Sequence, residues 1–274
     1  MSYETFFGLR EQPFSNAPES RYFYESRQHS EALVRLMHAI NTMKGLSVMV
    51  GEIGCGKTLL ARKLLENLET DSKFEAALLV IVHSEITAEW LLRKIASQLG
   101  VKTPGEKKAV ILPQLFERLM EIYEQGRKAV VIIDEANMLL TREIFEEFRG
   151  LLNLEAPGQK LLSINLFGLP ELEQNIALDP PLQQRVALKF TLQSLQENDV
   201  AEYVRHRVTI AGGQRDLFAP GAYKKIYLYS RGIPRLINTV CDNCLLESYL
   251  VKKETVDEGI VDGVGNDLGL KPDA

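Results

Sequence analysis

Residues 51–58 of this chain read Gly51-Glu52-Ile53-Gly54-Cys55-Gly56-Lys57-Thr58. The stretch fits G-x-x-x-x-G-K-[ST], a pattern in which a glycine-rich turn joins a buried strand to the start of a helix. Both flanks have the required character, because residues 46–50 form a short apolar run and residues 59–65 have the periodicity of an amphipathic helix. We therefore expect a strand, a phosphate-binding loop and a helix in this order.

The loop has the residue types that hold the phosphates of a nucleoside triphosphate, ATP or GTP. Its glycines allow a tight turn in which successive backbone N–H groups point into one concavity, and the following helix adds its positive dipole end. Lys57 is expected to reach the β- and γ-phosphates, and the Thr58 hydroxyl to bind Mg²⁺. The residues predicted to bind the nucleotide are Gly51, Glu52, Ile53, Gly54, Cys55, Gly56, Lys57, Thr58 and Leu59.

An acidic pair marks a second part of this site. Residues 129–133 are a continuous, mostly β-branched apolar run, which is typical of a central parallel strand, and Asp134 and Glu135 follow directly. The carboxyl end of such a strand lies at the same sheet edge as the phosphate loop. Asp134 is therefore predicted to hold Mg²⁺ through water, and Glu135 to polarise the attacking water as general base. The sequence thus predicts hydrolysis as well as binding.

Length and composition are those of an ordinary globular protein. The 274 residues allow one sizeable core and a smaller second domain, and 45% hydrophobic with 25% charged residues is a typical balance. The longest apolar run, residues 76–82, is too short to span a bilayer, and the first residues lack the pattern of a signal peptide. Three cysteines argue against a disulfide framework. We expect a cytoplasmic protein without a transmembrane segment.

The order of elements predicts an α/β fold followed by helices. Strands alternate with helices from Leu46 to Leu192, which favours a parallel sheet covered by helices on both faces. From Leu195 onward the pattern is helical only. We predict a nucleotide-binding core over residues 1–193 and a small helical lid over residues 194–274. Within the core, residues 1–45 hold an aromatic segment and a first helix; the aromatic segment either packs against a nucleotide base or forms a hydrophobic clasp on the core.

Together these motifs resemble an AAA+ ATPase, and more closely the general secretion pathway protein A family, with its ExeA-like and MshM-like members. The resemblance extends over almost the whole chain. The stretches that carry it are Phe6-Phe7-Gly8-Leu9, Pro13-Phe14, residues 51–60, Asp134-Glu135-Ala136, Leu151-Leu152-Asn153-Leu154-Glu155, residues 166–172 and Ser230-Arg231-Gly232-Ile233-Pro234-Arg235-Leu236-Ile237-Asn238. The set in this order is more specific than any of the motifs alone.

The resemblance implies roles for two arginines. Arg235 matches the sensor-2 arginine, which contacts the γ-phosphate from the lid; the alternative is a solvated residue at a helix start. Arg185 matches the arginine finger that a neighbouring subunit inserts into the site; the alternative is a surface ion pair. A finger acting in trans implies a homo-oligomer, a ring or spiral that we expect to be a hexamer, with activity that depends on assembly.

One position departs from the family pattern. Members usually have Gly-Gln-Pro-Glu-Leu after the fourth strand, where the glutamine is the polar sensor-1 group, whereas this chain has Leu169 there. Leucine cannot hydrogen-bond to water or phosphate. Asn165 is polar and close in sequence, but spacing alone does not say whether it substitutes. Hydrolysis is therefore expected to be slow or to need a partner.

The resemblance implies an ATPase that powers or regulates assembly of a type II secretion or type IV pilus system. Larger relatives carry a transmembrane helix and a peptidoglycan-binding domain after the lid; this chain stops at Ala274, as expected of a short MshM-like form or a truncated one. A membrane protein would then recruit it to the inner membrane face. Two alternatives stay open: a DNA-binding regulator of the transposition type, disfavoured by the net charge of −5, and a nucleotide-gated scaffold with little turnover.

Overall fold

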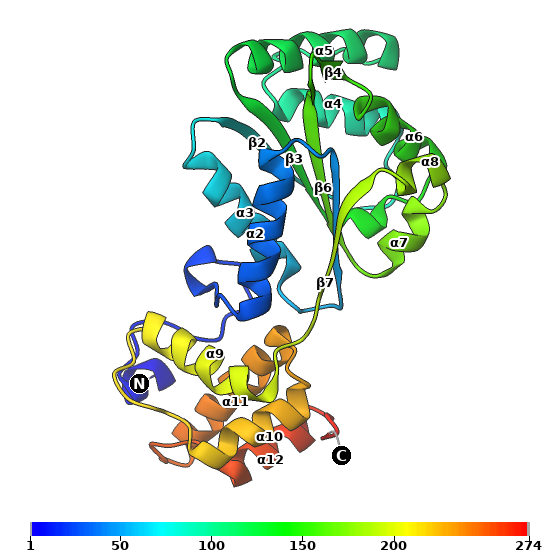
Figure 1. Cartoon of the computed structure of the whole chain (residues 1–274). Helices are drawn as coiled ribbons and strands as arrows, with labels where there is room; N and C mark the ends of the chain where they lie inside the picture. The colour runs from blue at the N-terminus through cyan, green and yellow to red at the C-terminus, as the bar shows by residue number, and fades with distance from the viewer. Residues whose placement is uncertain (1, 273–274) are drawn as a thin grey trace. The chain divides into compact units, whose positions relative to one another are not determined.

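The computed structural model describes residues 2–272 (Figure 1). The chain divides into two compact units, each with its own hydrophobic core. The α/β unit consists of Arg27–Ile53 and Lys57–Leu192. The helical unit consists of the chain up to Ser26, the three residues Gly54–Gly56, and the chain from Gln193 onward.

The α/β unit is built on a five-stranded sheet in which every pairing is parallel. The strand order is β2-β3-β6-β1-β7. The strands are β1 (Leu46–Gly51), β2 (Phe74–Val80), β3 (Lys128–Asp134), β6 (Leu162–Gly168) and β7 (Val186–Leu192). The three central strands are buried almost throughout, as expected of apolar runs covered on both sides. The predicted parallel sheet is confirmed.

Helices cover both faces of this sheet (Figure 1). The helices are α2 (Arg27–Asn41), α3 (Lys57–Glu69), α4 (Ala88–Gln98), α5 (Lys108–Glu124) and α6 (Arg142–Leu151). Alternate strand residues such as Val48 and Val131 pack with α4, α5 and α6 in one core cluster. Helices α2 and α3 cover the opposite face, where α2 contacts β7 and α3 contacts the central strands. Because successive side chains of a strand point to opposite faces of the sheet, each strand packs against both helix layers.

Several short elements have too few residues for a periodic pattern, and the sequence analysis did not predict them. They are the turn η2 (Ala136–Met138), the hairpin strands β4 (Glu155–Ala156) and β5 (Gln159–Lys160), and the helices α7 (Glu171–Ile176) and α8 (Pro180–Gln183). Helix α8 starts with two prolines, and the carboxylate of Asp179 caps it by accepting the N–H of Leu182.

The helical unit confirms the predicted change to helices after the sheet. It contains α9 (Glu197–Ile210), α10 (Pro220–Ser230), α11 (Pro234–Leu250) and α12 (Glu258–Asp267), together with α1 (Tyr3–Phe7) and the turn η1 (Ser20–Tyr22). Among residues 2–272 the longest helices are α5 and α11, with 17 residues each. No helix in that range has both the length and the apolar character needed to cross a membrane.

The aromatic segment near the start of the chain belongs to the helical unit. The sequence analysis assigned residues 1–45 to the nucleotide-binding core, whereas the structure groups only the part from Arg27 onward with the α/β unit. The side chains of Tyr3, Phe7 and Phe14 are buried in the same cluster as residues of α9, α10 and α11. The segment is therefore a hydrophobic clasp, but on the helical core rather than on the sheet.

A buried arginine fastens this segment to α9. Arg207 is 4% exposed, and its guanidinium donates to the carbonyl oxygens of Pro13 at 2.6 Å and Ser15 at 2.8 Å. It also donates to the Tyr203 hydroxyl at 3.0 Å and lies 4.6 Å from the ring centroid of Tyr22. A buried charge needs such partners, because burial without hydrogen bonds costs several kcal/mol, of order 2–7 for even a neutral polar group. The backbone of the clasp supplies them.

We expect the helical unit to lose stability in alkaline solution. Burial raises the pKa of Tyr22 to about 12 and of the Cys244 thiol to about 12, and it raises the pKa values of Tyr203 and Cys241 as well. The folded state thus favours the protonated forms. Their stabilisation is complete below the unfolded pKa values, about 8.5 for cysteine and about 10 for tyrosine, and is lost as the pH rises toward the folded values.

The test is urea denaturation followed by circular dichroism at a series of pH values from neutral to strongly alkaline, with tyrosine ionisation followed by absorbance. The expected result is a denaturation midpoint that falls with pH and tyrosinate that appears together with unfolding. Tyrosines that all ionise near their ordinary pKa while the helices persist would contradict this expectation.

Candidate nucleotide-binding site

In the α/β unit, the residues predicted to bind the nucleotide and Mg²⁺, together with Glu135, lie at one edge of the sheet. Because the strands are parallel, their carboxyl ends lie at the same edge, where β1 ends at Gly51, β3 at Asp134 and β6 at Gly168. The register pairs Val50 with Gly168 and Ile133 with Leu166, so β6 stands between β1 and β3. Open α/β sheets bind ligands in the crevice at such an edge.

The loop after β1 has the backbone geometry that its glycines predict. Gly54 and Gly56 have φ angles of 82° and 98°, in the left-handed region that residues with a side chain rarely adopt. Helix α3 starts directly afterwards at Lys57, and Thr58 and Leu59 follow in its first turn. The turn therefore leads into a helix N-terminus, the arrangement that presents backbone N–H groups to an anion.

The ammonium group of Lys57 is held at this loop. Its Nζ donates to the carbonyl oxygens of Gly51 at 2.8 Å and Glu52 at 2.9 Å, and the residue is 7% exposed. These carbonyls satisfy a cation that would otherwise be costly to bury. The Cys55 side chain is also buried. The loop thus has a positive charge fixed by its own backbone.

Asp134 and Glu135 lie where β3 leaves the sheet. Asp134 is 1% exposed, and its Oδ1 accepts the backbone N–H of Glu135 at 3.0 Å. Glu135 is half-buried and has a left-handed backbone conformation, with φ 55° and ψ 35°. A carboxylate of this kind is a hard oxygen ligand suited to Mg²⁺, and a second carboxylate beside it suits a general base.

The residues present fit a nucleoside triphosphate with Mg²⁺. The turn through Gly54 and Gly56 and the N-terminus of α3 provide backbone donors for phosphate oxygens, and Lys57 provides a fixed cation. Thr58 offers a hydroxyl and Asp134 a carboxylate, both oxygen ligands. Mg²⁺ needs few protein ligands when phosphates supply others, so this small set is sufficient.

Arg185 lies at the other end of the sheet. It precedes Val186, which pairs with Leu46 at the start of β1, whereas Gly51 at the end of β1 pairs with Leu192. At about 3.3 Å per residue, the length of β1 separates the two edges by roughly 20 Å. Arg185 therefore lies far from the edge that carries the loop of its own α/β unit.

The half-buried side chain of Arg185 is ordered by its surroundings. Its Nη1 donates to the carbonyl oxygen of Arg149 at 3.0 Å and to Oδ1 of Asn153 at 2.7 Å. The Arg149 side chain in turn donates to the buried carboxylate of Asp179 at 3.0 Å, the group that caps α8. Residues near the end of α6 and the start of α8 thus hold the Arg185 side chain. Within residues 2–272 its acceptors are neutral oxygens, so the alternative of a surface ion pair is not seen there, and the finger role stays a prediction.

Asn165 and Leu169 have different surroundings. Asn165 is fully buried within β6, where it pairs in register with Ser47 and Ile132, and its Oδ1 has no hydrogen-bond partner among the described residues. It lies three residues, about 10 Å, before Gly168 and so below the sheet edge. The Leu169 side chain is half-buried, and its backbone N–H donates to Asn137. Asn165 does not take the place of Leu169 at the edge.

Arg235 is the second residue of α11 and is exposed, with its carbonyl oxygen accepting the Thr239 hydroxyl at 3.0 Å. Pro234 occupies the first position of that helix, where its missing N–H costs nothing. The position agrees with a helix start as the sequence predicted. The sensor-2 role of Arg235 stays a prediction.

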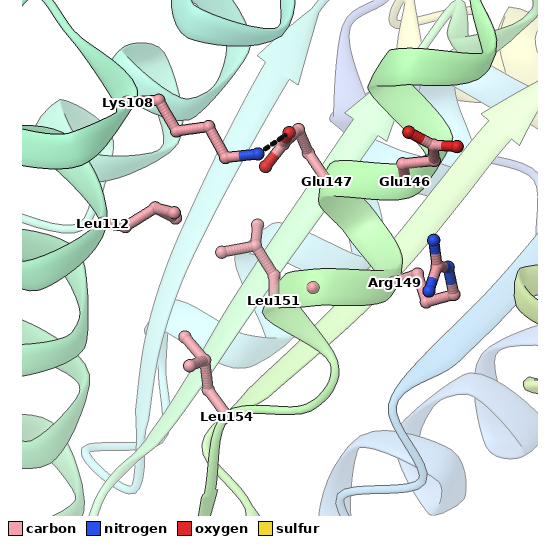
Figure 2. Close-up of a pocket in the computed structure, with 8 residues that line it drawn as sticks. Lys108, Leu112, Glu146, Glu147, Arg149, Leu151 and Leu154 are labelled. Atoms are coloured by element: carbon pink, nitrogen blue, oxygen red, sulfur yellow. Dashed lines mark hydrogen bonds and ion pairs between the residues drawn. The ribbon is translucent and has the colours of Figure 1, made fainter.

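A groove of about 330 Å³ lies between α5 and α6, apart from this site (Figure 2). Figure 2 shows Lys108 reaching across it to Glu147, with which it forms an ion pair, above the apolar side chains of Leu112 and Leu151. None of the residues predicted to bind the nucleotide lines it. Arg149 on its rim is linked to a predicted residue, because its carbonyl oxygen accepts a hydrogen bond from Arg185.

Comparison with known proteins agrees with this arrangement. Residues 40–176, half of the chain, match the AAA domain family. The General secretion pathway protein A of Aeromonas hydrophila is 36% identical over 252 residues, which are 90% of this chain and 45% of that protein. The chain therefore spans less than half the length of this relative.

Solved structures share the fold. The ORC2 protein of Aeropyrum pernix covers 94% of this chain, and 71% of its own chain, with a TM-score of 0.69 and 16% identity. The RuvB Holliday junction branch migration motor of Thermotoga maritima covers 87% of this chain, and 69% of its own, with a TM-score of 0.56 and 17% identity. At these identities the likeness concerns the fold alone. With the matched domain, the phosphate loop and the parallel sheet, this chain belongs to the AAA domain family.

Proposed function

We propose that this protein is a Mg²⁺-dependent ATPase that works as an oligomer. The observation that carries the proposal is the placement of the loop after β1 and of Asp134 and Glu135 after β3, at one edge of the sheet with only β6 between them. This is the arrangement that phosphoryl transfer to water requires: a cradle for the phosphates, and carboxylates beside it.

The residues divide the work as follows. Lys57 and the N-terminus of α3 bind the β- and γ-phosphates, and Thr58 and Asp134 hold the metal. Bound Mg²⁺ supplies charge neutralisation on the phosphates. Glu135, a half-buried residue directly after β3, accepts a proton from the attacking water.

The position of Arg185 supports the proposal that the protein forms an oligomer. The residue lies roughly 20 Å from the phosphate-binding edge of its own α/β unit, by the rise of the strands, so its natural target is the site of a neighbouring copy. A planar guanidinium is the group best suited to stabilise charge on a transferring phosphoryl group. Arg235 is proposed to contact the γ-phosphate. We expect a ring or spiral, six copies per turn or ring.

The similarity to General secretion pathway protein A supports a proposal about the cellular process in which this chain takes part. The name of that relative places it in the general secretion pathway. We propose that this chain powers or regulates assembly of a type II secretion or type IV pilus machine, on the cytoplasmic side of the inner membrane. A membrane protein is its expected partner. The net charge of −5 offers no general basic surface for DNA, which disfavours a function on nucleic acid.

The test is steady-state ATP turnover as a function of protein concentration, with the Glu135→Gln variant as the blank and with duplex DNA added in a parallel series. We expect specific activity that rises with concentration, because a finger in trans requires assembly, and that falls to background in Glu135→Gln. DNA is expected to leave turnover unchanged.

Strong stimulation of ATP turnover by DNA would overturn the proposed role in secretion or pilus assembly and favour a function on nucleic acid. The proposed ATPase activity would still stand. Turnover equal to the Glu135→Gln blank at every concentration would overturn the ATPase and favour a scaffold that binds nucleotide. Specific activity that does not vary with concentration, in a protein shown to be monomeric, would overturn the oligomer.

A further inference from the structure

The segment after Glu135 is tied to a neighbouring strand by a side-chain hydrogen bond. Asn137 lies in the turn η2, directly after the acidic pair. Its Oδ1 accepts the backbone N–H of Leu169 at 2.9 Å. Because Leu169 follows the last residue of β6, this bond connects the end of β3 with the end of β6.

A second amide extends the link to α7. The Nδ2 group of Asn175 donates to the carbonyl oxygen of Asn137 at 3.0 Å and to that of Leu139 at 3.2 Å. One side chain thus satisfies two carbonyls at the end of η2 that the short turn leaves without helical partners. Asn137 and Asn175 together connect three pieces of chain: η2, the loop after β6, and α7.

The last residue of β6, Gly168, packs directly on η2. A Cβ atom at Gly168 would lie 2.9 Å from Oδ1 of Asn137 and 3.0 Å from its backbone N, too close for a side chain. The backbone of β6 therefore lies directly against Asn137 at this point, and only glycine fits at position 168. Because the two segments are closely packed, a displacement at the end of β6 would also displace η2.

Glu135 has a backbone that needs this support. A left-handed conformation costs a residue with a Cβ about 1–2 kcal/mol, and such residues persist only where their surroundings fix them. On one side, Glu135 donates its N–H to Asp134 and accepts the N–H of Met138 at 2.9 Å. On the other side, the bonds of Asn137 and Asn175 hold the turn that Glu135 starts.

We propose that Asn137 and Asn175 are positioning residues that fix the direction of the Glu135 carboxylate through the backbone of η2. The inference rests on the proposed ATPase function and assigns to that site two residues that sequence analysis did not select. It also gives Leu169 a role that its apolar side chain does not exclude, since the bond to Asn137 uses the backbone N–H.

The experiment compares Asn137→Ala, Asn137→Asp and Asn175→Ala with the wild-type chain of 274 residues. Asn137→Asp keeps an acceptor oxygen for the Leu169 N–H, and Asn41→Ala, an exposed asparagine at the end of α2, is the matched control. The measurements are kcat and KM for ATP, affinity for a slowly hydrolysed ATP analogue, and the melting temperature.

We expect kcat to fall by up to about 10²-fold in Asn137→Ala and Asn175→Ala, because a misplacement of about 1 Å has an effect of that size. Analogue affinity should stay at the wild-type value, since neither residue belongs to the phosphate loop. Asn137→Asp should recover most of the turnover, and Asn41→Ala should match the wild type.

Wild-type kcat in both alanine variants would overturn the inference and leave the ATPase intact. Parallel losses of kcat, affinity and melting temperature, with Asn137→Asp no better than Asn137→Ala, would reduce the two residues to a structural role and also overturn it. A wild-type chain no faster than Glu135→Gln would overturn the proposed function itself, and the inference with it.

Discussion

Replacing Lys57 with alanine is expected to weaken ATP binding by about 30-fold or more, since removal of one partner of a buried charge pair costs about 2–5 kcal/mol. Two effects add. The variant loses the cation that is proposed to bind the phosphates, and it also loses the hydrogen bonds from Nζ to the carbonyl oxygens of Gly51 and Glu52. Turnover should fall with binding.

Lys63→Ala provides the control for the Lys57 variant. Lys63 lies on the same helix, α3, and its ion pair with Glu66 is partly exposed, so removal of this charge should leave binding unchanged. Affinity is measured by titration with a fluorescent ATP analogue, and folding by circular dichroism. A folded Lys57→Ala chain that binds the analogue as tightly as the wild type does would refute the assignment of the phosphate loop.

Replacing Arg185 with alanine is expected to lower turnover by about 10³-fold or more, the effect of an arginine finger in related phosphoryl transfers. The informative measurement is the turnover of a mixture of two inactive variants, Glu135→Gln and Arg185→Ala. Glu135→Gln subunits keep the finger but lack the base, and Arg185→Ala subunits keep the base but lack the finger. Mixing the two inactive proteins should therefore restore turnover, because sites between unlike copies have both groups.

Two further variants separate this effect from folding. Lys189→Ala removes an exposed cation from β7, the edge strand that follows Arg185, and should keep full activity. Arg185→Lys keeps the positive charge but loses the planar guanidinium with its paired N–H donors, so ATP turnover should stay slow. If Arg185 acts only within its own chain, through Arg149 and Asn153, the mixture will show no more than the sum of its two components.

Local sequence patterns were sufficient for the sheet and for the loop. The apolar runs at residues 46–50 and 129–133 became central strands because a parallel strand covered on both faces needs an unbroken apolar stretch. Asp134 was recognisable because it interrupts such a stretch. The glycines of the loop were recognisable because their spacing reflects backbone angles that other residues rarely adopt.

The parts that sequence reasoning missed depend on contacts between distant segments. Asn137 and Asn175 are 38 positions apart, and each is an unremarkable polar residue within its own stretch. The clasp is a similar case. Its aromatic residues indicated that the segment is buried, but the surface that buries it, on α9 to α11, lies nearly two hundred positions later in the sequence. A single sequence gives no register between such segments. The one available signal for Asn137 was its place next to the acidic pair.

The composition of the helical unit has a consequence for synthesis on the ribosome. Its core needs Tyr3, Phe7 and Phe14, which emerge early, and α9 to α11, which emerge only after the entire sheet region has been translated. At about 5–20 residues per second, the early aromatic side chains wait roughly ten to fifty seconds for their partners. During that interval these side chains are exposed apolar surface, and the carbonyl oxygens of Pro13 and Ser15 lack the guanidinium of Arg207, which comes only with α9. The α/β unit, whose residues are nearly continuous in the chain, can be complete before then, so the newborn protein has a finished nucleotide-binding sheet and an unfinished helical partner.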